Sequence, residues 1–294
     1  MTVSRFWIAL AVVSLGASTA LADDGYKGSF TLTPFATDQF TSSYGEASVH
    51  IARVGANLDH TYPINDRLKF GATLKFEDSV YDFNDFKHES PGVKTPIDNA
   101  WLWRLTPNLT YVANEHWIFQ GGALLQSSSQ VGADFGDTLT YGAYGLVMYR
   151  VNENLTIGGG AAYYTLLEDG SSLLPLLSIE WKINDQWRFT GRGTEARISY
   201  FPQPQVSVYV AGSYDTREYR LEESAPYSNG VLTDDSIPVR LGCQWTPTDQ
   251  LTIAGEVGAI ISQTLTFDDS KGHRIVKDDV DPTVFIGLQF SYKF

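Results

Sequence analysis

Hydrophobic and polar residues alternate along much of the chain, in long runs that short polar clusters separate. In the run that begins at residue 251, Leu251, Ile253 and Val257 fall on one side of an extended chain, and Thr252 and Glu256 fall on the other. This alternation indicates β-strands, because successive side chains of a strand point to opposite faces of the sheet. Several runs keep one phase for about 10 residues or more, whereas strands of soluble sheets cluster near about 5 to 6 residues. Such lengths favour strands that cross a membrane at a tilt, and a sheet in lipid must close to pair its backbone groups.

The runs predict an all-β fold, a closed antiparallel up-and-down transmembrane β-barrel of about fourteen strands. The expected strands are residues 28–36, 47–62, 67–83, 99–112, 116–128, 138–151, 155–166, 173–183, 186–193, 194–201, 205–221, 237–246, 251–267 and 282–294. The evidence is weakest for the first run and for the tight pair over 186–201, which gives a range of about twelve to sixteen strands. An even number places both termini at the same end of the barrel.

The connections between the runs differ at the two ends of the predicted strands. One set is short and rich in Asn, Asp and Pro, as in "IND" at 64–66, "VNEN" at 151–154 and "TPTDQ" at 246–250, which is the chemistry of tight turns. The other set is longer and acidic, as in "EESAPYSNGVLTDDS" at 222–236 and "FDDSKGHRIVKDDVD" at 267–281. Short turns at one end and long polar loops at the other are typical of an outer-membrane barrel.

The long connections contain aspartate pairs at 234–235, 268–269 and 278–279. No segment has the alternating carboxylates and the turn glycine of a dedicated calcium loop, so we predict no specific metal site. We expect these segments to be solvated loops that collect divalent ions diffusely near anionic lipopolysaccharide.

The first residues have the layout of a secretory signal peptide. A single positive charge at Arg5 precedes an apolar stretch from Phe6 to Leu15, and the small-residue site Ala20-Leu21-Ala22 follows. The apolar stretch is shorter than the ~20 residues that a membrane-spanning helix needs. The predicted organisation is therefore a signal peptide at 1–22 and a single outer-membrane barrel domain at 23–294.

Charge and cysteine content exclude some classes of function. The chain has 34 acidic and 21 basic residues, a formal net charge of −13, and so acidic a chain is a poor ligand for nucleic acid. Cys243 is the one cysteine, so no disulfide forms within the chain, and a lone cysteine in a strand is more often a small apolar filler than a nucleophile.

Aromatic residues make up 13% of the chain, a high fraction for a secreted soluble domain. Trp117 and Trp187 lie just after short turns, and Tyr149, Trp181 and Trp245 lie just before them. Ordinary packing between strands would explain any one of these rings. Their repetition over several hairpins favours an aromatic girdle at a membrane interface.

The C-terminal stretch "FIGLQFSYKF" carries the one family resemblance in the sequence. Hydrophobic residues stand at every second position, at Leu288, Phe290, Tyr292 and Phe294. This stretch resembles the C-terminal signature of bacterial outer-membrane β-barrel proteins, an uncharacterised family of porin-like architecture. The resemblance implies recognition by the barrel assembly machinery, and residence in the outer membrane, with its lipid and lipopolysaccharide, after export through the periplasm.

Charged residues of the opposite phase would line the interior if the apolar phase faces lipid. The candidate lumen-lining residues are Arg53, Lys69, Arg104, Arg150, Glu180, Lys182, Arg188, Arg192, Glu195, Arg197, Arg240 and Glu256. Basic groups predominate, and in a water-filled pore they would favour anionic or polar solutes. The alternative is structural, because arginine and glutamate across a narrow lumen form hydrogen-bonded networks that fill a barrel.

The sequence contains no defensible catalytic constellation, since its five histidines are scattered over separate segments, and we predict neither enzymatic activity nor a cofactor. The leading hypothesis is a narrow or gated passive channel for small polar or anionic solutes. The alternative is a non-conducting structural, adhesive or receptor barrel that acts through its extracellular loops. A soluble secreted sandwich would instead fold in buffer without detergent.

Overall fold

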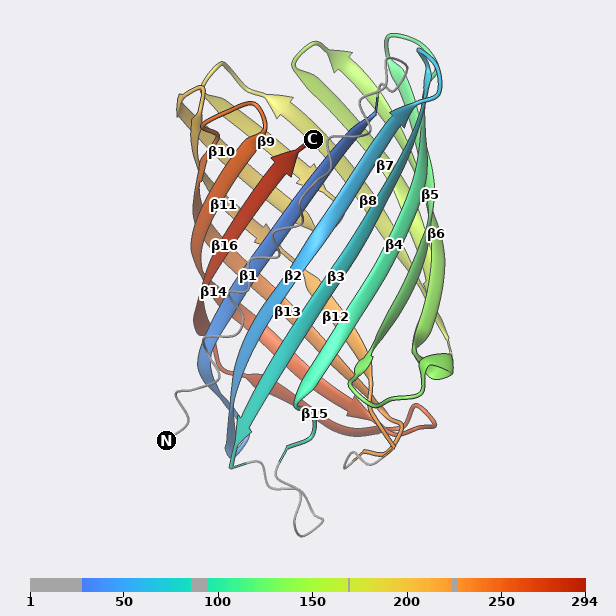
Figure 1. The fold of residues 1–294 in the computed structure, drawn as a ribbon, viewed down its shortest axis with the longest axis vertical. Coiled ribbons are helices and arrows are strands. Elements are labelled where there is room, and N and C mark those ends of the chain that lie inside the picture. The colour runs from blue at the N-terminus through green and yellow to red at the C-terminus, as the bar shows by residue number, and fades with distance from the viewer. Residues whose placement is uncertain (1–27, 86–94, 169, 224–226) are drawn as a thin grey trace.

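The chain forms a closed β-barrel (Figure 1). The computed structural model describes residues 28–85, 95–168, 170–223 and 227–294, so the predicted signal peptide lies outside the described residues. The strands are β1 (Ser29–Tyr44), β2 (Ala47–Pro63), β3 (Leu68–Asn84), β4 (Asn99–Val112), β5 (Trp117–Gln130), β6 (Leu139–Asn152), β7 (Leu155–Thr165), β8 (Ser171–Lys182), β9 (Trp187–Arg192), β10 (Glu195–Gln203), β11 (Val206–Ser213), β12 (Asp215–Arg220), β13 (Val231–Trp245), β14 (Leu251–Asp268), β15 (Arg274–Val280) and β16 (Thr283–Lys293), with a short 3-10 helix, η1 (Phe135–Thr138), before β6.

These sixteen described segments include fourteen wall strands, because β12 and β15 are continuations of the wall strands β11 and β16. β11 and β12 pair with successive parts of β13, and β15 and β16 pair with successive parts of β14. All neighbouring wall strands are antiparallel, and β1 closes the ring by pairing with β16. The predicted fold class, a closed antiparallel barrel of about fourteen strands, is confirmed.

Three predicted boundaries are wrong, all on the side of the long connections. β1 continues to Tyr44, β13 begins at Val231 instead of 237, and β15 occupies part of a predicted loop. The aspartate pairs at 234–235 and 278–279 therefore lie in strands rather than in solvated loops. Asp234 is 0% exposed, and partners inside the barrel satisfy its carboxylate, which is the condition under which a charged residue is buried.

The two faces of the wall have the predicted character. Leu288, Phe290 and Tyr292 are exposed on the outer surface, whereas Arg104 and Glu256 line a cavity inside the barrel. The outward positions of β16 are hydrophobic at every second residue, as a lipid-facing strand requires. Recognition of these residues by an assembly machinery stays a prediction.

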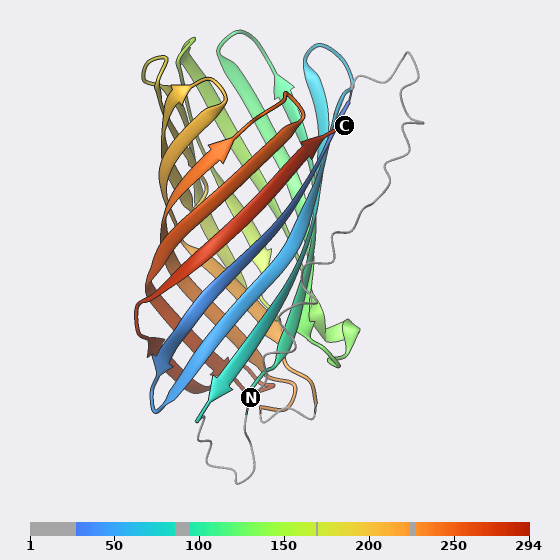
Figure 2. The same cartoon turned by 60° about the vertical axis from the view of Figure 1, so that its left-hand side comes forward.

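The two ends of the barrel differ (Figure 2). At the short-turn end, tight turns such as 183–186 join the strands, and the C-terminus lies beside β1, where the Phe294 amide donates to the Phe30 carbonyl. At the long-loop end lie η1 and the longer connections. None of the described residues forms a helix long and apolar enough to cross a membrane.

Candidate functional site: the lumen of the barrel

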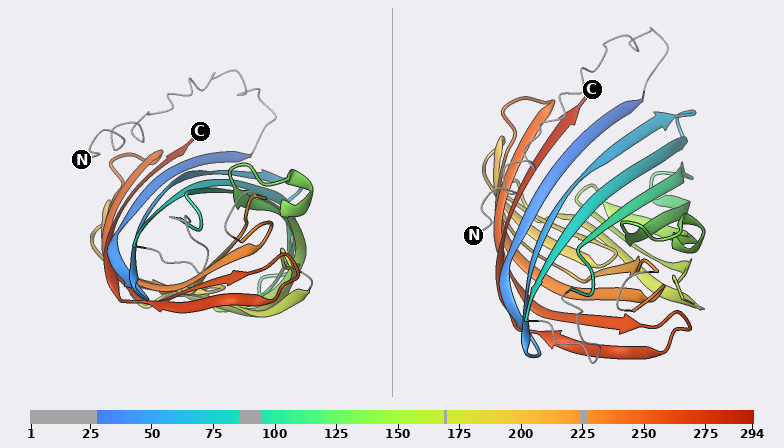
Figure 3. Two further views of the ribbon diagram at one scale, coloured as in Figure 1. Left: turned by 90° about the horizontal axis from the view of Figure 1, so that it is seen from below. Right: turned by 60° about the horizontal axis from the view of Figure 1, so that its bottom comes forward.

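β12 leaves the wall and crosses the lumen at the long-loop end (Figure 3). Its residues pair with β13 along one edge, from Asp215 opposite Ser236 to Arg220 opposite Val231. At its far end Arg220 also pairs with Ser129 of β5, in a parallel bridge. Since β5 belongs to the opposite part of the ring, β12 divides the interior at this end.

An apolar plug fills the interior at the long-loop end. It includes Tyr219 and Leu221, at the end of β12 and just after it, which pack with hydrophobic side chains from the surrounding strands. The remaining members of the plug are Tyr44, Ala47, Val49, Ile51, Tyr81, Phe83, Ile97, Ala100, Leu102, Tyr227, Leu232, Leu265, Phe267 and Val280. These buried side chains form a hydrophobic core of the kind that fills soluble domains.

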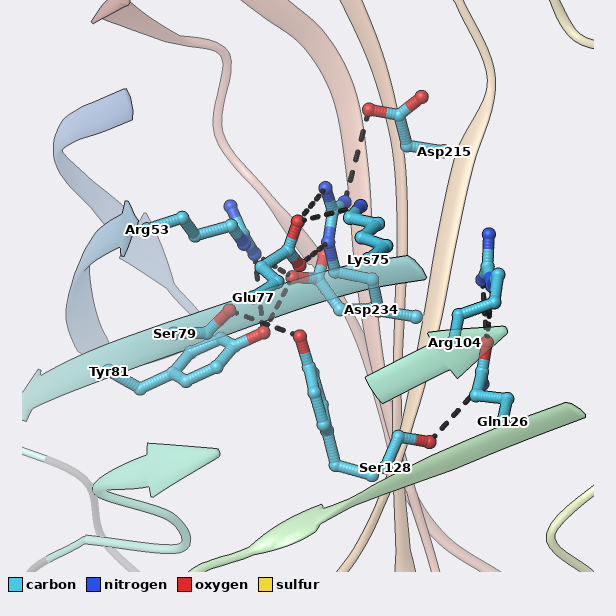
Figure 4. A network of polar contacts seen from close by, with 12 residues as sticks. Arg53, Lys75, Glu77, Ser79, Tyr81, Arg104, Gln126, Ser128, Asp215 and Asp234 are labelled. Atoms are coloured by element: carbon cyan, nitrogen blue, oxygen red, sulfur yellow. Dashed lines mark hydrogen bonds and ion pairs between the residues drawn. The ribbon is translucent and has the colours of Figure 1, made fainter. Parts of the chain in front are cut away.

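A network of charged and polar side chains lies next to the plug, inside the barrel (Figure 4). The Arg217 guanidinium of β12 donates from Nε to Oε1 of Glu77 on β3 at 2.7 Å, and Nζ of Lys75 lies 3.0 Å from the other carboxylate oxygen. Glu77 is 1% exposed. Two cations thus surround one buried carboxylate. The pair between Arg217 and Glu77 connects the crossing strand β12 to β3 of the wall.

A second buried carboxylate, Asp234 on β13, lies next to this network. It accepts hydrogen bonds from Arg53 Nη2 at 2.5 Å, from the Tyr81 hydroxyl at 2.9 Å and from Gln263 Nε2 at 2.7 Å. These donors come from β2, β3 and β14. Asp234 therefore joins β2, β3 and β14 to β13.

The end of β12 is also held by the connection between β7 and β8. The Arg220 guanidinium contacts Glu168 at 2.6 Å, and it donates to the carbonyls of Leu167, Asn229 and Asp137. Multiple donors in a fixed fork make arginine suited to this role. The Arg220 end of β12 is thus held by several contacts, and the strand forms a partition across the lumen.

A cavity of about 630 Å³ lies between the plug and the short-turn end. Arg104 faces this cavity from β4, and its guanidinium donates from Nε and Nη2 to Gln126 Oε1 at 2.8 and 2.6 Å. Among the described residues no carboxylate lies within 4 Å of Arg104. Its guanidinium is therefore hydrogen-bonded to a neutral amide and takes part in no ion pair among the described residues.

A cluster of ion pairs lines the other side of the same cavity. Arg240 Nη2 donates to Glu195 at 2.6 Å, and its Nε lies 3.8 Å from Glu256. The Arg197 guanidinium sits 3.8 Å from the centre of the Tyr209 ring, a cation–π contact. On this side of the cavity arginine and glutamate form ion pairs with each other. Such pairs are what the structural alternative, a hydrogen-bonded network inside the barrel, predicts.

The structure divides the twelve candidate lumen residues into two groups. Six line the cavity: Arg53, Arg104, Glu195, Arg197, Arg240 and Glu256. The other six, Lys69, Arg150, Glu180, Lys182, Arg188 and Arg192, are not part of its lining, and some of them form local ion pairs, such as that between Arg192 and Glu180 and that between Lys182 and Asp185. Whether any of them acts on a solute stays a prediction.

Sequence reasoning missed the residues that hold the partition. The sequence predicts a loop at Asp234, and Glu77 and Arg217 are not among the candidate lumen-lining residues. Simple alternation would have found two of them, because Glu77 has the same phase as Lys75, and Arg217 has the same phase as the inward-facing Tyr209. No sequence signal indicates that β12 leaves the wall.

The described residues contain no group of three or more His, Cys, Asp and Glu side chains placed to hold a metal ion.

Sequence comparison matches residues 118–293 to a family model described as a domain of unknown function, DUF6268. The chain belongs to the DUF6268 family. Among curated proteins, none matches its sequence.

Solved structures share the fold of this DUF6268 protein. The outer-membrane channel COG4313 from Pseudomonas putida F1 has a TM-score of 0.50 and 10% identity, over 91% of this chain and 95% of that chain. The toluene transporter TodX from Pseudomonas putida has a TM-score of 0.50 and 12% identity, over 92% and 90%. A FadL homologue from Pseudomonas aeruginosa has a TM-score of 0.50 and 12% identity, over 90% of each chain. Such likenesses concern the architecture, which is that of an outer-membrane channel barrel.

Proposed function

We propose that this protein is a narrow passive channel of the outer membrane for small polar or anionic solutes. The observation that carries the proposal is the cavity of about 630 Å³ inside the barrel, a size within the range of small-molecule sites. Six basic residues and five acidic residues line it. A site with many charged groups favours polar solutes. Such solutes can replace their hydrogen bonds to water by hydrogen bonds to the lining residues.

Arg104 gives the anionic preference its specific basis. Because its neighbour Gln126 supplies no charge, a solute carboxylate or phosphate near this guanidinium would meet a cation that takes part in no ion pair among the described residues. Each of the other cations of the cavity lies within 4 Å of Glu77, Asp234, Glu195 or Glu256, and the weakest of these pairs is that of Arg197, whose Nε lies 3.8 Å from Glu195. Arg104 is therefore the best candidate for contact with an anion.

The channel is narrow because the apolar plug and β12 occupy the long-loop end. We infer that an axial current requires displacement of β12, and that the conformation described here is of low conductance. Residence in the outer membrane, export through the periplasm and insertion by the barrel assembly machinery belong to the same proposal. The fold shared with an outer-membrane channel and a toluene transporter supports it, although the latter's name indicates an apolar solute.

Single-channel recording in planar bilayers tests the proposal. We expect small current steps that increase when the plug is weakened by Tyr219→Gly with Leu221→Gly, in protein whose folding is verified by heat-modifiable electrophoretic mobility. Arg104→Gln should lower the anion-to-cation permeability ratio by about twofold or more.

The matched control is Arg150→Gln, an exposed lumen-phase arginine near the short-turn end that donates to the Glu115 carbonyl. It should change the permeability ratio less than Arg104→Gln does. Folded protein that never conducts, together with an equally silent plug variant, would remove the channel and favour the non-conducting structural, adhesive or receptor barrel.

A further inference from the structure

The barrel wall is interrupted beside the long-loop half of β8. β8 pairs with β7 along its whole length, from Ser171 opposite Thr165 to Trp181 opposite Leu155. On its other edge, pairing with β9 extends only over Ser178–Lys182. Among the described residues no strand pairs with this edge over 171–176.

The next strands do not fill this interval, because they are short or turn inward. The turn between β9 and β10 reaches no further than Leu177, whose carbonyl accepts from the Gly193 amide, and the Thr194 carbonyl accepts from Tyr214. Beyond Tyr214 the chain continues as β12, which crosses the lumen. We call the interval between residues 171–177 of β8 and residues 215–219 of β12 the wall break.

The backbone of β8 is adapted to an unpaired edge. Leu177 directs its carbonyl toward Gly193, whereas Lys182 directs its amide toward Asn154, on the β7 side. Odd-numbered residues of β8 therefore direct their backbone groups away from β7, and Leu173 and Pro175 direct theirs into the wall break. Proline has no amide hydrogen, so it suits an edge position, where it removes one unsatisfied donor.

Unpaired backbone groups at membrane depth cost several kcal/mol each when lipid covers them, and they occur where they line a water-filled cavity or are buried in protein. The cavity meets this requirement. Its lining includes Leu174 of β8 on one side of the wall break, and Thr194, Tyr214 and Thr216 on the other. The cavity therefore extends to the wall break.

The strand that borders the wall break is apolar on both faces. Leu173 and Leu177 point outward and are 69% and 64% exposed. Leu174 and Leu176 have the opposite phase and point inward. A solute that passes this edge would thus contact leucine from the lipid side to the cavity, and would then meet Arg104, Gln126 and the other polar groups of the lining.

We propose that the wall break is a lateral port between the cavity and the lipid around the barrel, and that it passes small amphipathic solutes with an apolar body and one polar or anionic end. The leucines of β8 match the body, and Arg104 matches the end group. The proposal uses the same cavity as the proposed channel, but it concerns the path through the wall. Axial conductance and lateral entry are measured separately, so the failure of one is distinguishable from the failure of the other.

Amide exchange by NMR in nanodiscs tests the state of the edge. The Leu173 amide, which points into the wall break, should exchange at least about 100-fold faster than the amides of Leu174 and Leu176, which point toward β7. Equal protection of all three amides would contradict the port, since it would mean that a strand of a second copy, or another segment, pairs with the edge.

A long-chain alkyl maleimide dissolved in the bilayer tests entry directly, since it is itself amphipathic. In a Cys243→Ser background, Leu173→Cys reports outer access and Leu174→Cys reports the cavity side of the edge. The control is Ala254→Cys on β14, an inward position whose strand has unbroken pairing on both edges there. A water-soluble maleimide, applied after denaturation, counts the thiols that remain unmodified.

We expect Leu174→Cys to react at a rate within about threefold of Leu173→Cys, and at least about tenfold faster than Ala254→Cys. If Leu174→Cys is as slow as Ala254→Cys, the reagent does not cross the wall break and the port is wrong. If both inward thiols react rapidly, the reagent enters along the axis, and lateral entry is again contradicted.

Discussion

The two sides of the barrel wall differ in how completely they are paired. From β1 to β7 the strands have 11 to 17 residues, and each pairs with its neighbours along most of its length. From β8 to β12 they have 6 to 12 residues, and the ladder between β8 and β9 contains five residue pairs. The continuous side resembles the wall of a simple barrel, whereas the interrupted side supplies the partition β12 and the wall break. Both features on which the proposed port depends therefore lie where regular strand pairing stops.

The largest effect is expected where the partition is attached to the continuous side. Glu77→Gln leaves Arg217 and Lys75 buried without their carboxylate, and removing one partner of a buried ion pair costs about 3–5 kcal/mol. Urea titration in lipid vesicles, followed by tryptophan fluorescence, measures the free energy of unfolding.

The matched control is Asp185→Asn, which removes an ion pair with Lys182 at an exposed turn and should have no measurable effect. An equally small effect of Glu77→Gln would show that the network does not attach β12 to the wall.

A charge placed on the lipid face should distinguish the two sides of the wall. Val147 of β6 and Leu177 of β8 both face outward. Both are paired with Gly159 of β7, one on each edge of that strand. Val147→Arg should cost about 2–4 kcal/mol. Leu177→Arg should cost at least about 1 kcal/mol less, because its guanidinium reaches water in the wall break. The same vesicle titration gives both values, and equal costs would mean that the wall break is sealed from water.

Close packing should also make Gly160, on the continuous side, less tolerant of an added methyl group than Gly191, on the interrupted side. A Cβ at Gly160 of β7 would lie 1.9 Å from the Gly145 carbonyl oxygen of β6, so the backbone must shift. Gly160→Ala is expected to cost about 1–3 kcal/mol.

At Gly191 of β9 the nearest atom would be 3.7 Å away. Gly191→Ala should therefore be neutral or slightly stabilising, because a side chain reduces the entropy of the unfolded strand. Equal losses of unfolding free energy for the two variants would contradict the proposed difference in packing.

Most wall strands on both sides were predictable from sequence, whereas the departure of β12 from the wall was not. Alternation fixed the phase of residues such as Leu288 and Arg104, because lipid on one side and water or polar groups on the other impose a period of two residues. That rule does not distinguish a strand in the wall from one that crosses the lumen, so β12 was read as the end of one long strand. The aspartates of β13 suggested a loop, because burial of Asp234 depends on Arg53, Tyr81 and Gln263, which are distant in sequence.

Fluorescence quenching by brominated phospholipids tests most directly that hydrophobic positions face lipid and the alternate positions face the lumen. In a Cys243→Ser background, a bimane label is attached at Phe290→Cys or at its neighbour Gln289→Cys. Phe290 is exposed on the outer face, and Gln289 lines the cavity. We predict strong quenching at position 290 and little at 289. Stronger quenching at 289 than at 290, or none at either position in folded protein, would contradict the membrane-spanning barrel.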